Sequence, residues 1–156
     1  MPHGNNPGAF LLAKFPVGGV TVGLYPTITD PGSFWLHFGA AVNIQNFLPQ
    51  GGPPGALNAS ALNPSLRTSA GVFAGQVLAL QLNSQLEGLG SLTLSGTGTS
   101  LDGETVAQVL AAANLALSGG ALPSGFTYSS LNDLIDSLNS SFDGCVASGF
   151  GHTNLH

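Results

Sequence analysis

The chain has 156 residues, and charged residues make up only 6% of them, whereas an average soluble domain carries about 25%. Lys14 and Arg67 are the only Lys or Arg residues, against seven Asp or Glu, so the formal net charge is −5. This balance excludes nucleic-acid binding by phosphate neutralisation and disfavours docking on an anionic membrane, while a hydrophobic fraction of 43% excludes a disordered chain.

The length predicts one folded domain with two extended ends. Residues 1–19 are interrupted by Pro and Gly and predict an extended arm, residues 20–144 predict a single globular domain, and residues 145–156 predict a glycine-rich tail. The arm lacks the continuous apolar stretch of a secretion signal, and no run of 18 apolar residues predicts a membrane span.

The first half of the domain predicts strands and loops. Within residues 17–25, Val20 and Val22 alternate with small or polar residues, which predicts a strand. Residues 33–48 are rich in aromatic and β-branched residues, and the pattern leaves strand and helix both open. The Pro- and Gly-rich residues 49–67 predict a long loop, either functional or folded over the surface.

The second half predicts three helices. The first, at residues 68–86, has Ser69 as its expected N-cap and is apolar on most of its circumference, which predicts a central, buried helix. Asp102 is the expected N-cap of the second, at residues 102–117, with Glu104 in its first turn and Gly119-Gly120 ending it.

The third predicted helix covers residues 129–142. Its apolar residues follow the helical period and predict one buried face: Leu131, Leu134, Ile135, Leu138 and Phe142. Between the first two helices, residues 88–101 predict a short strand at Leu92 and Leu94 followed by a loop. The fold class is therefore predicted as α+β, with a strand-and-loop half packed on about three helices.

No pattern predicts a catalytic, cofactor-binding or metal-ligating residue. His37 lies in an aromatic run and is expected to be a half-buried histidine that finds its own hydrogen bonds. His152 and His156 have the spacing of two metal ligands on a helix, but neighbouring glycines oppose a helix there. Asp133 and Asp136 are expected on the solvent face of the last helix. Because no pairing of a nucleophile with a base is recognisable in the sequence, we expect no enzyme, and we expect no cofactor.

Two asparagines are candidates for glycosylation, and the single cysteine is a candidate for a bond to another chain. Asn58 and Asn139 both match the N-glycosylation triplet, and Asn58, in the predicted loop, is the better acceptor. Cys145 is the only cysteine, so it is either a free buried thiol or bonded to another chain.

Three segments together resemble a helical module of secreted and cell-surface bacterial proteins. Residues 71–86 include GVFAGQVLALQLN, which is similar to the module's A-x-Q-L-x-A-x-x-L-N pattern; residues 106–117 and 131–139 match its second and third helices. Tyr25-Pro26-Thr27 departs from the module's Trp/Tyr-x-Asn element. The resemblance implies an extracellular setting and a structural or accessory role, with Gln76 and Asn83 as buried hydrogen-bonding residues between helices.

These observations predict a self-assembling extracellular protein, a subunit of a filament, sheath or surface layer. Few charged groups have to be desolvated when identical copies pack, and the arm 1–19 and the tail 145–156 are expected to dock on neighbouring copies. The alternative is an adhesion module that binds sugar or peptide through aromatic residues such as Tyr25, Phe34 and Trp35. An enzyme using His37 is the third and least favoured class.

Overall fold

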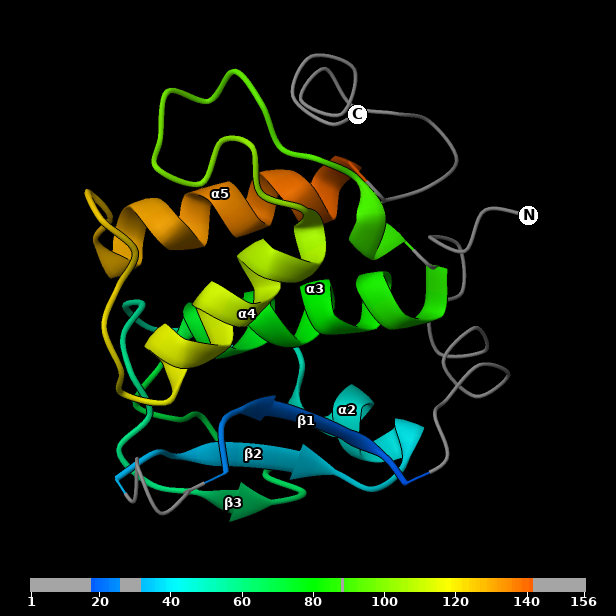
Figure 1. Cartoon of the computed structure of the whole chain (residues 1–156). Helices are drawn as coiled ribbons and strands as arrows, with labels where there is room; N and C mark the ends of the chain where they lie inside the picture. The colour runs from blue at the N-terminus through cyan, green and yellow to red at the C-terminus, as the bar shows by residue number, and fades with distance from the viewer. Residues whose placement is uncertain (1–17, 26–31, 88, 142–156) are drawn as a thin grey trace.

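The computed structural model describes residues 18–25, 32–87 and 89–141 (Figure 1). The predicted α+β class is confirmed. The elements follow the order β1 (Val20–Gly23), β2 (Trp35–Phe38), α2 (Ala41–Phe47), β3 (Ala61–Leu62), α3 (Val72–Glu87), the 3-10 turn η2 (Leu89–Ser91), α4 (Val106–Leu117) and α5 (Tyr128–Ser141).

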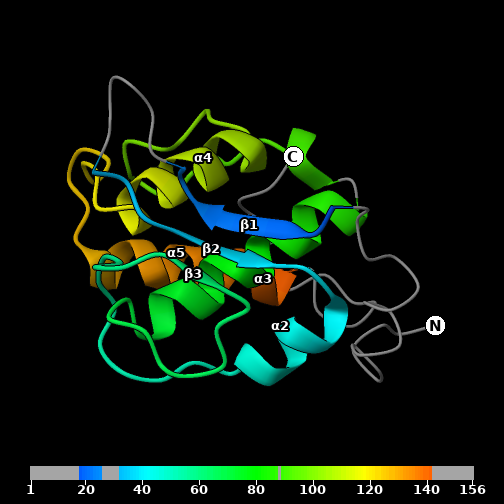
Figure 2. The same ribbon diagram turned by 90° about the horizontal axis from the view of Figure 1, so that it is seen from below.

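The three strands form a mixed sheet with helices on one of its faces. In the order β1-β2-β3, β2 pairs antiparallel with β1 and parallel with β3. Helices α3 and α4 both contact β1, and α5 packs on α3 on the side away from the sheet. Seen from below in Figure 2, the sheet lies in front of α3, α4 and α5. The opposite face of the sheet is therefore the one that these helices leave open.

Alternation along the strands separates the two faces of the sheet. Val20, Val22, Leu36 and Phe38 point toward the helices and are at most 2% exposed, as expected for the buried face of a strand. The strand predicted within residues 17–25 is confirmed as β1, although it ends at Gly23.

Residues 33–48, for which the sequence pattern allowed either a strand or a helix, contain one of each. The β2 strand is followed by a two-residue turn and then by α2, whose residues Ala41, Ile44 and Phe47 are buried at helical spacing. The rings of Phe38 and Phe47 pack edge to face with their centroids 5.0 Å apart. This contact fixes the short helix against the end of the sheet.

Helix α3 is central, as predicted, but it begins four residues later than the predicted start at 68. Ser69 is not its N-cap: the Ser69 hydroxyl donates to the carbonyl oxygen of Ala56 and accepts the N–H of Asn58, both at 2.9 Å. The chain then turns through Gly71, whose φ of +58° suits glycine, before the helix starts at Val72. The predicted cap therefore closes a loop instead.

Helix α4 begins at Val106, so the predicted start at Asp102 was wrong. Its N-cap is Thr105, which exchanges hydrogen bonds with Gln108 in a capping box. Glu104 precedes the cap and is not in the first turn of the helix. The predicted stop at Gly119-Gly120 is confirmed, because the N–H groups of these glycines bond the carbonyl oxygens of Ala116 and Leu115 in a Schellman pattern.

Asp102 instead organises the turn before α4. Its carboxylate accepts hydrogen bonds from the backbone N–H groups of Thr97, Gly98 and Thr99 and from the Thr97 hydroxyl. These donors lower the pKa of Asp102, with the Thr97 hydroxyl as the largest cause. The strand predicted at Leu92 and Leu94 is not formed: Thr93 and Leu94 are isolated bridge residues, and Thr93 pairs with Thr105.

Helix α5 closely matches its predicted range of 129–142. Leu131, Leu134, Ile135 and Leu138 form the predicted buried face. Phe142 lies outside the described residues, as do most of the arm 1–19, the tail 145–156 with Cys145, and the histidines His3, His152 and His156. No helix among the described residues is long and apolar enough to cross a membrane.

The end of α4 joins the two halves of the chain. The carbonyl oxygens of Leu117 and Ser118 accept the N–H groups of Leu57 and Phe34 at 2.9 and 3.1 Å. These are carbonyls that a helix end leaves without partners inside the helix. One turn earlier, the Asn114 side chain accepts the N–H of Gly23 at 2.8 Å, which holds the end of β1 against the helix.

Candidate functional site

Among the described residues, the open face of the sheet has no Asp, Glu, Lys or Arg side chain and is partly apolar. The register of the strands aligns Thr21, His37 and Leu62 across β1, β2 and β3, and Leu62 is 65% exposed. Two residues further along the strands, Trp35 lies opposite Gly23. These side chains alternate with the buried ones and point away from α3 and α4. We call Thr21, Tyr25, Trp35, His37 and Leu62 the outer face.

Tyr25 and Trp35 form an aromatic pair at one end of the outer face. Their ring centroids are 4.9 Å apart and the rings are tilted by 44°. Tyr25 is 50% exposed, and its hydroxyl lies 3.5 Å from that of Thr21. Trp35 is half-buried, and its backbone N–H donates to the Ser60 hydroxyl at 3.0 Å. The pair thus presents ring surface and a hydroxyl group together.

His37 sits in the middle strand and has a hydrogen-bond partner, as predicted. Its Nδ1 lies 2.7 Å from the Thr21 hydroxyl, and the residue is half-buried. Its ring also lies over Gly19, where an added Cβ would be 2.8 Å from Nε2. No group of three His, Cys, Asp or Glu residues that could hold a metal ion occurs within the described ranges.

The acidic residues of α5 lie on the solvent face of the helix, as the helical period of the sequence predicts. Asp133 and Asp136 are both exposed, so the predicted solvent face is confirmed. Asp136 accepts a hydrogen bond from the Gln76 amide of α3 at 3.1 Å. The carboxylate therefore belongs to the contact between two helices.

Gln76 and Asn83 are interhelical hydrogen-bonding residues, as predicted, but they are half-buried rather than fully buried. Asn83 donates to the Asn139 side-chain oxygen at 3.0 Å, and the Asn139 amide donates to the side-chain and backbone oxygens of Gln76 at 2.7 and 3.1 Å. Because all the polar atoms of Asn139 are engaged here, this residue is a poor glycan acceptor. Asn58 is exposed, and its glycosylation stays a prediction.

The second surface feature is a closed loop at the β3 edge of the sheet. Residues 58–69 leave the body of the protein and return to it, and the two Ser69 hydrogen bonds to Ala56 and Asn58 tie the ends together. A compact loop with adjacent ends is an Ω loop, and we call residues 58–69 by that name. Just beyond the ends of β3 and β2, the side-chain oxygen of Asn63 accepts the N–H of Gly39 at 2.8 Å.

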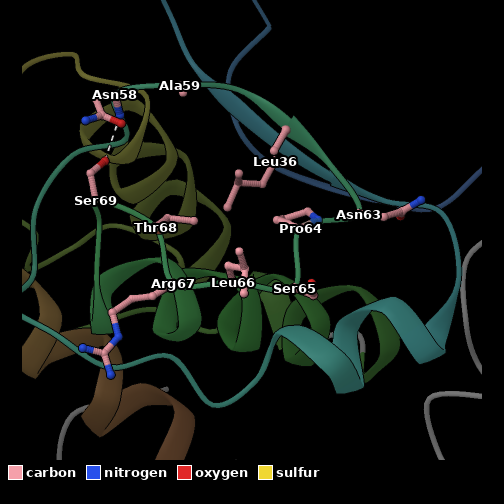
Figure 3. A pocket seen from close by; sticks show the side chains of 11 residues that line it. Leu36, Asn58, Ala59, Asn63, Pro64, Ser65, Leu66, Arg67, Thr68 and Ser69 are labelled. Carbon is pink, nitrogen blue, oxygen red and sulfur yellow. Dashed lines mark hydrogen bonds between the residues drawn. The ribbon is translucent and has the colours of Figure 1, made fainter.

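The Ω loop surrounds a hollow of about 440 Å³. Figure 3 shows Leu36 of β2, Pro64, Leu66 and Thr68 directed toward its middle. Arg67 points away from it (Figure 3), and the guanidinium lies against Gly51, where an added Cβ would be 3.0 Å from a guanidinium nitrogen. The full lining is Leu36, Asn58, Ala59, Ala61, Asn63, Pro64, Ser65, Leu66, Arg67, Thr68 and Ser69.

The sequence predicted a long loop here but not its apolar side chains. Leu62 and Leu66 are 65% and 80% exposed, the highest values among the large hydrophobic residues described. The available signal was the presence of these two leucines in a segment otherwise made of Ala, Asn, Pro, Ser, Arg and Thr, since loop residues are usually polar. Comparisons with protein families, with curated proteins and with solved structures return no match.

Proposed function

We propose that this chain is a subunit of a self-assembling extracellular structure, such as a filament, a sheath or a surface layer. The observation that supports this best is the outer face, which has aromatic and aliphatic groups and no charged side chain among its members. Two of its residues are exposed to water over half or more of their surface, Tyr25 to 50% and Leu62 to 65%. Covering such groups with a neighbouring molecule is favourable in proportion to the apolar area removed from water.

The placement of charge supports contact between identical copies. Asp102 and Glu104 lie in the turn before α4, and Asp133 and Asp136 lie on α5, which is on the far side of α3 from the sheet. Two outer faces can therefore approach without bringing these carboxylates together. Among the described residues of the outer face there is no Asp, Glu, Lys or Arg whose desolvation would oppose such an approach.

An extracellular setting fits the composition of the chain. With only two Lys or Arg residues, the protein offers few cleavage points to trypsin-like proteases. A surface rich in Ser, Thr, Asn and Gly can hydrogen-bond across copies without ion pairs, so such contacts depend little on salt.

Electron microscopy and light scattering of the purified chain test the proposal. We expect regular assemblies whose abundance rises with protein concentration, and scattering that is unchanged between low and high salt. Trp35 is the only tryptophan and lies on the outer face, so its emission should shift to shorter wavelength as copies associate. Monomers at every concentration, with unchanged Trp35 emission, would refute self-assembly.

A second candidate function is the binding of a neutral sugar, and the Tyr25–Trp35 pair favours it. Two tilted rings beside the hydroxyls of Thr21 and Tyr25 offer stacking surface and hydrogen bonds at one place. Binding to a glycan array that is lost in both Trp35→Ala and Tyr25→Ala, and retained in Val42→Ala on the exposed side of α2, would favour this function over assembly.

A further inference from the structure

His37 is the one member of the outer face whose side chain belongs to a type that changes charge near neutral pH. It lies in the middle strand, between Thr21 of β1 and Leu62 of β3 in the strand register. Histidine changes its charge between about pH 5 and pH 8, whereas a phenol such as that of Tyr25 is neutral throughout this range. Acidification therefore brings a positive charge to the centre of a face whose other described members are uncharged.

The hydrogen bond between His37 and Thr21 can be made in both charge states of the ring. His37 Nδ1 lies 2.7 Å from the Thr21 hydroxyl, and a hydroxyl group both donates and accepts. It donates to Nδ1 when the neutral ring carries its proton on Nε2, and it accepts from the Nδ1–H of the charged ring. Protonation therefore changes the charge of the outer face and leaves this contact of the fold in place.

The described elements around His37 bring no carboxylate to it. Strand β2 contacts β1, β3 and α2, and none of these three elements contains Asp, Glu, Lys or Arg. The imidazole ring lies over Gly19, which has no side chain to offer, while Arg67 of the Ω loop is held against Gly51. Helix α3, whose only charged residue is Glu87, lies on the other face of the sheet. A charge on His37 therefore depends on water for its solvation.

We propose that His37 makes self-assembly through the outer face depend on pH, with association at neutral pH and release at acidic pH. Covering a charged group without giving it a partner opposes association, so the assembled state selects the neutral imidazole. Association is then coupled to the loss of a proton, and it weakens as the pH falls through the range in which histidine becomes charged. This inference rests on the proposed self-assembly and concerns the regulation of the same surface.

Sedimentation velocity at pH 7.5 and at pH 5.5 tests the proposal. Where only the neutral imidazole can be covered, the dissociation constant should rise about tenfold over this interval for each histidine at the contact. Total charge predicts the opposite trend, because acidification brings the net charge of −5 toward zero and thereby favours association. Weaker association at pH 5.5 would therefore report a local charge at the contact.

Two variants assign the effect to His37. His37→Gln has no titrating group and keeps an amide that can hydrogen-bond Thr21, so it should associate at least as tightly at pH 5.5 as at pH 7.5. The matched control replaces His3, His152 and His156 together with glutamine, which leaves His37 as the only histidine, and it should keep the whole pH dependence. Loss of the pH dependence in this control, or its persistence in His37→Gln, would overturn the proposal.

The two proposals fail in different ways. If wild type forms no dimers or larger species at either pH, self-assembly itself is refuted, and its regulation with it. If wild type assembles equally well at both pH values, regulation by His37 is refuted and the proposed function stands. Circular dichroism of the dilute chain should be the same at both pH values; loss of folded structure at pH 5.5 would also refute the regulation, because dissociation would then follow unfolding.

Discussion

Asn139 of α5 holds the middle position in a relay of side-chain hydrogen bonds that joins α5 to α3. Asn83 donates to Asn139, Asn139 donates to Gln76, and Gln76 donates to the Asp136 carboxylate. The Asn139 amide also donates to the backbone oxygen of Gln76. Replacing Asn139 with alanine removes three hydrogen bonds at once and interrupts the relay in its middle.

The expected cost of Asn139→Ala follows from these three bonds. A protein hydrogen bond contributes roughly 0.5–1.5 kcal/mol net, and bonds at a half-buried contact belong to the lower part of this range. We therefore expect the free energy of unfolding to fall by about 2 kcal/mol. For a chain of this length, that corresponds to a decrease in Tm of about 4–8 °C.

Urea unfolding followed by far-ultraviolet circular dichroism measures this cost. Ser140→Ala, at the exposed neighbouring position, is the control and should stay within about 0.5 kcal/mol of wild type. The double variant with Asn83→Ala should destabilise by at least about 0.5 kcal/mol less than the sum of the single variants, because the two residues share a bond. An Asn139→Ala protein as stable as wild type, with an unchanged slope against urea, would refute the relay.

Three further substitutions test the local structures around α3 and α4. Thr105→Ala removes the N-cap of α4 and should cost about 1 kcal/mol in a urea titration, whereas equal stability would show that the capping box with Gln108 contributes nothing. Folding lowers the pKa of Asp102, so the Asp102 carboxylate stabilises the fold above its unfolded pKa, and this stabilisation is lost as the pH falls through its folded pKa. The Tm should therefore drop less on acidification for Asp102→Asn than for wild type. Gly71→Ala should prevent folding or cost about 2 kcal/mol or more by thermal unfolding, because φ is +58° and an added Cβ would meet backbone oxygens of the preceding loop; a wild-type Tm would contradict this geometry.

The parts of the fold that the sequence predicts well are those where one period dominates. In α5 the leucines repeat at helical spacing and all of them that are described are buried. In β1 the two valines alternate with smaller residues, and both are buried. Each pattern is local and is repeated within a few residues, so tertiary contacts reinforce it rather than compete with it.

The wrong predictions concern residues whose side chains can serve two purposes. Ser69 and Asp102 are both good N-cap residues, yet each binds N–H groups of a turn instead of the first turn of a helix. The same oxygen chemistry forms caps and turns. The choice depends on segments such as residues 56–58, which come close only in the folded chain.

The outer face and the hollow of the Ω loop could not be predicted from the sequence, for a different reason. Alternation shows that Thr21 and His37 point away from Val20 and Val22, but it does not show whether another helix covers them. The hollow lies within residues 58–69, whose ends are held together by hydrogen bonds of the Ser69 hydroxyl. Both features depend on the global arrangement of elements, which no local period encodes.

The hydrogen bonds that connect the end of α4 to the first half of the chain also imply an order in which the contacts of the fold form. Gly23 and Asn114 are 91 positions apart, and Leu57 and Phe34 likewise depend on carbonyls of the late helix. Contacts this distant in sequence form slowly, because much loop entropy is lost before they gain anything. During synthesis, the strands therefore leave the ribosome long before α4, and a nascent chain that stops short of α4 lacks the hydrogen bonds that Asn114 and the carbonyl groups of the helix end make to Gly23, Phe34 and Leu57.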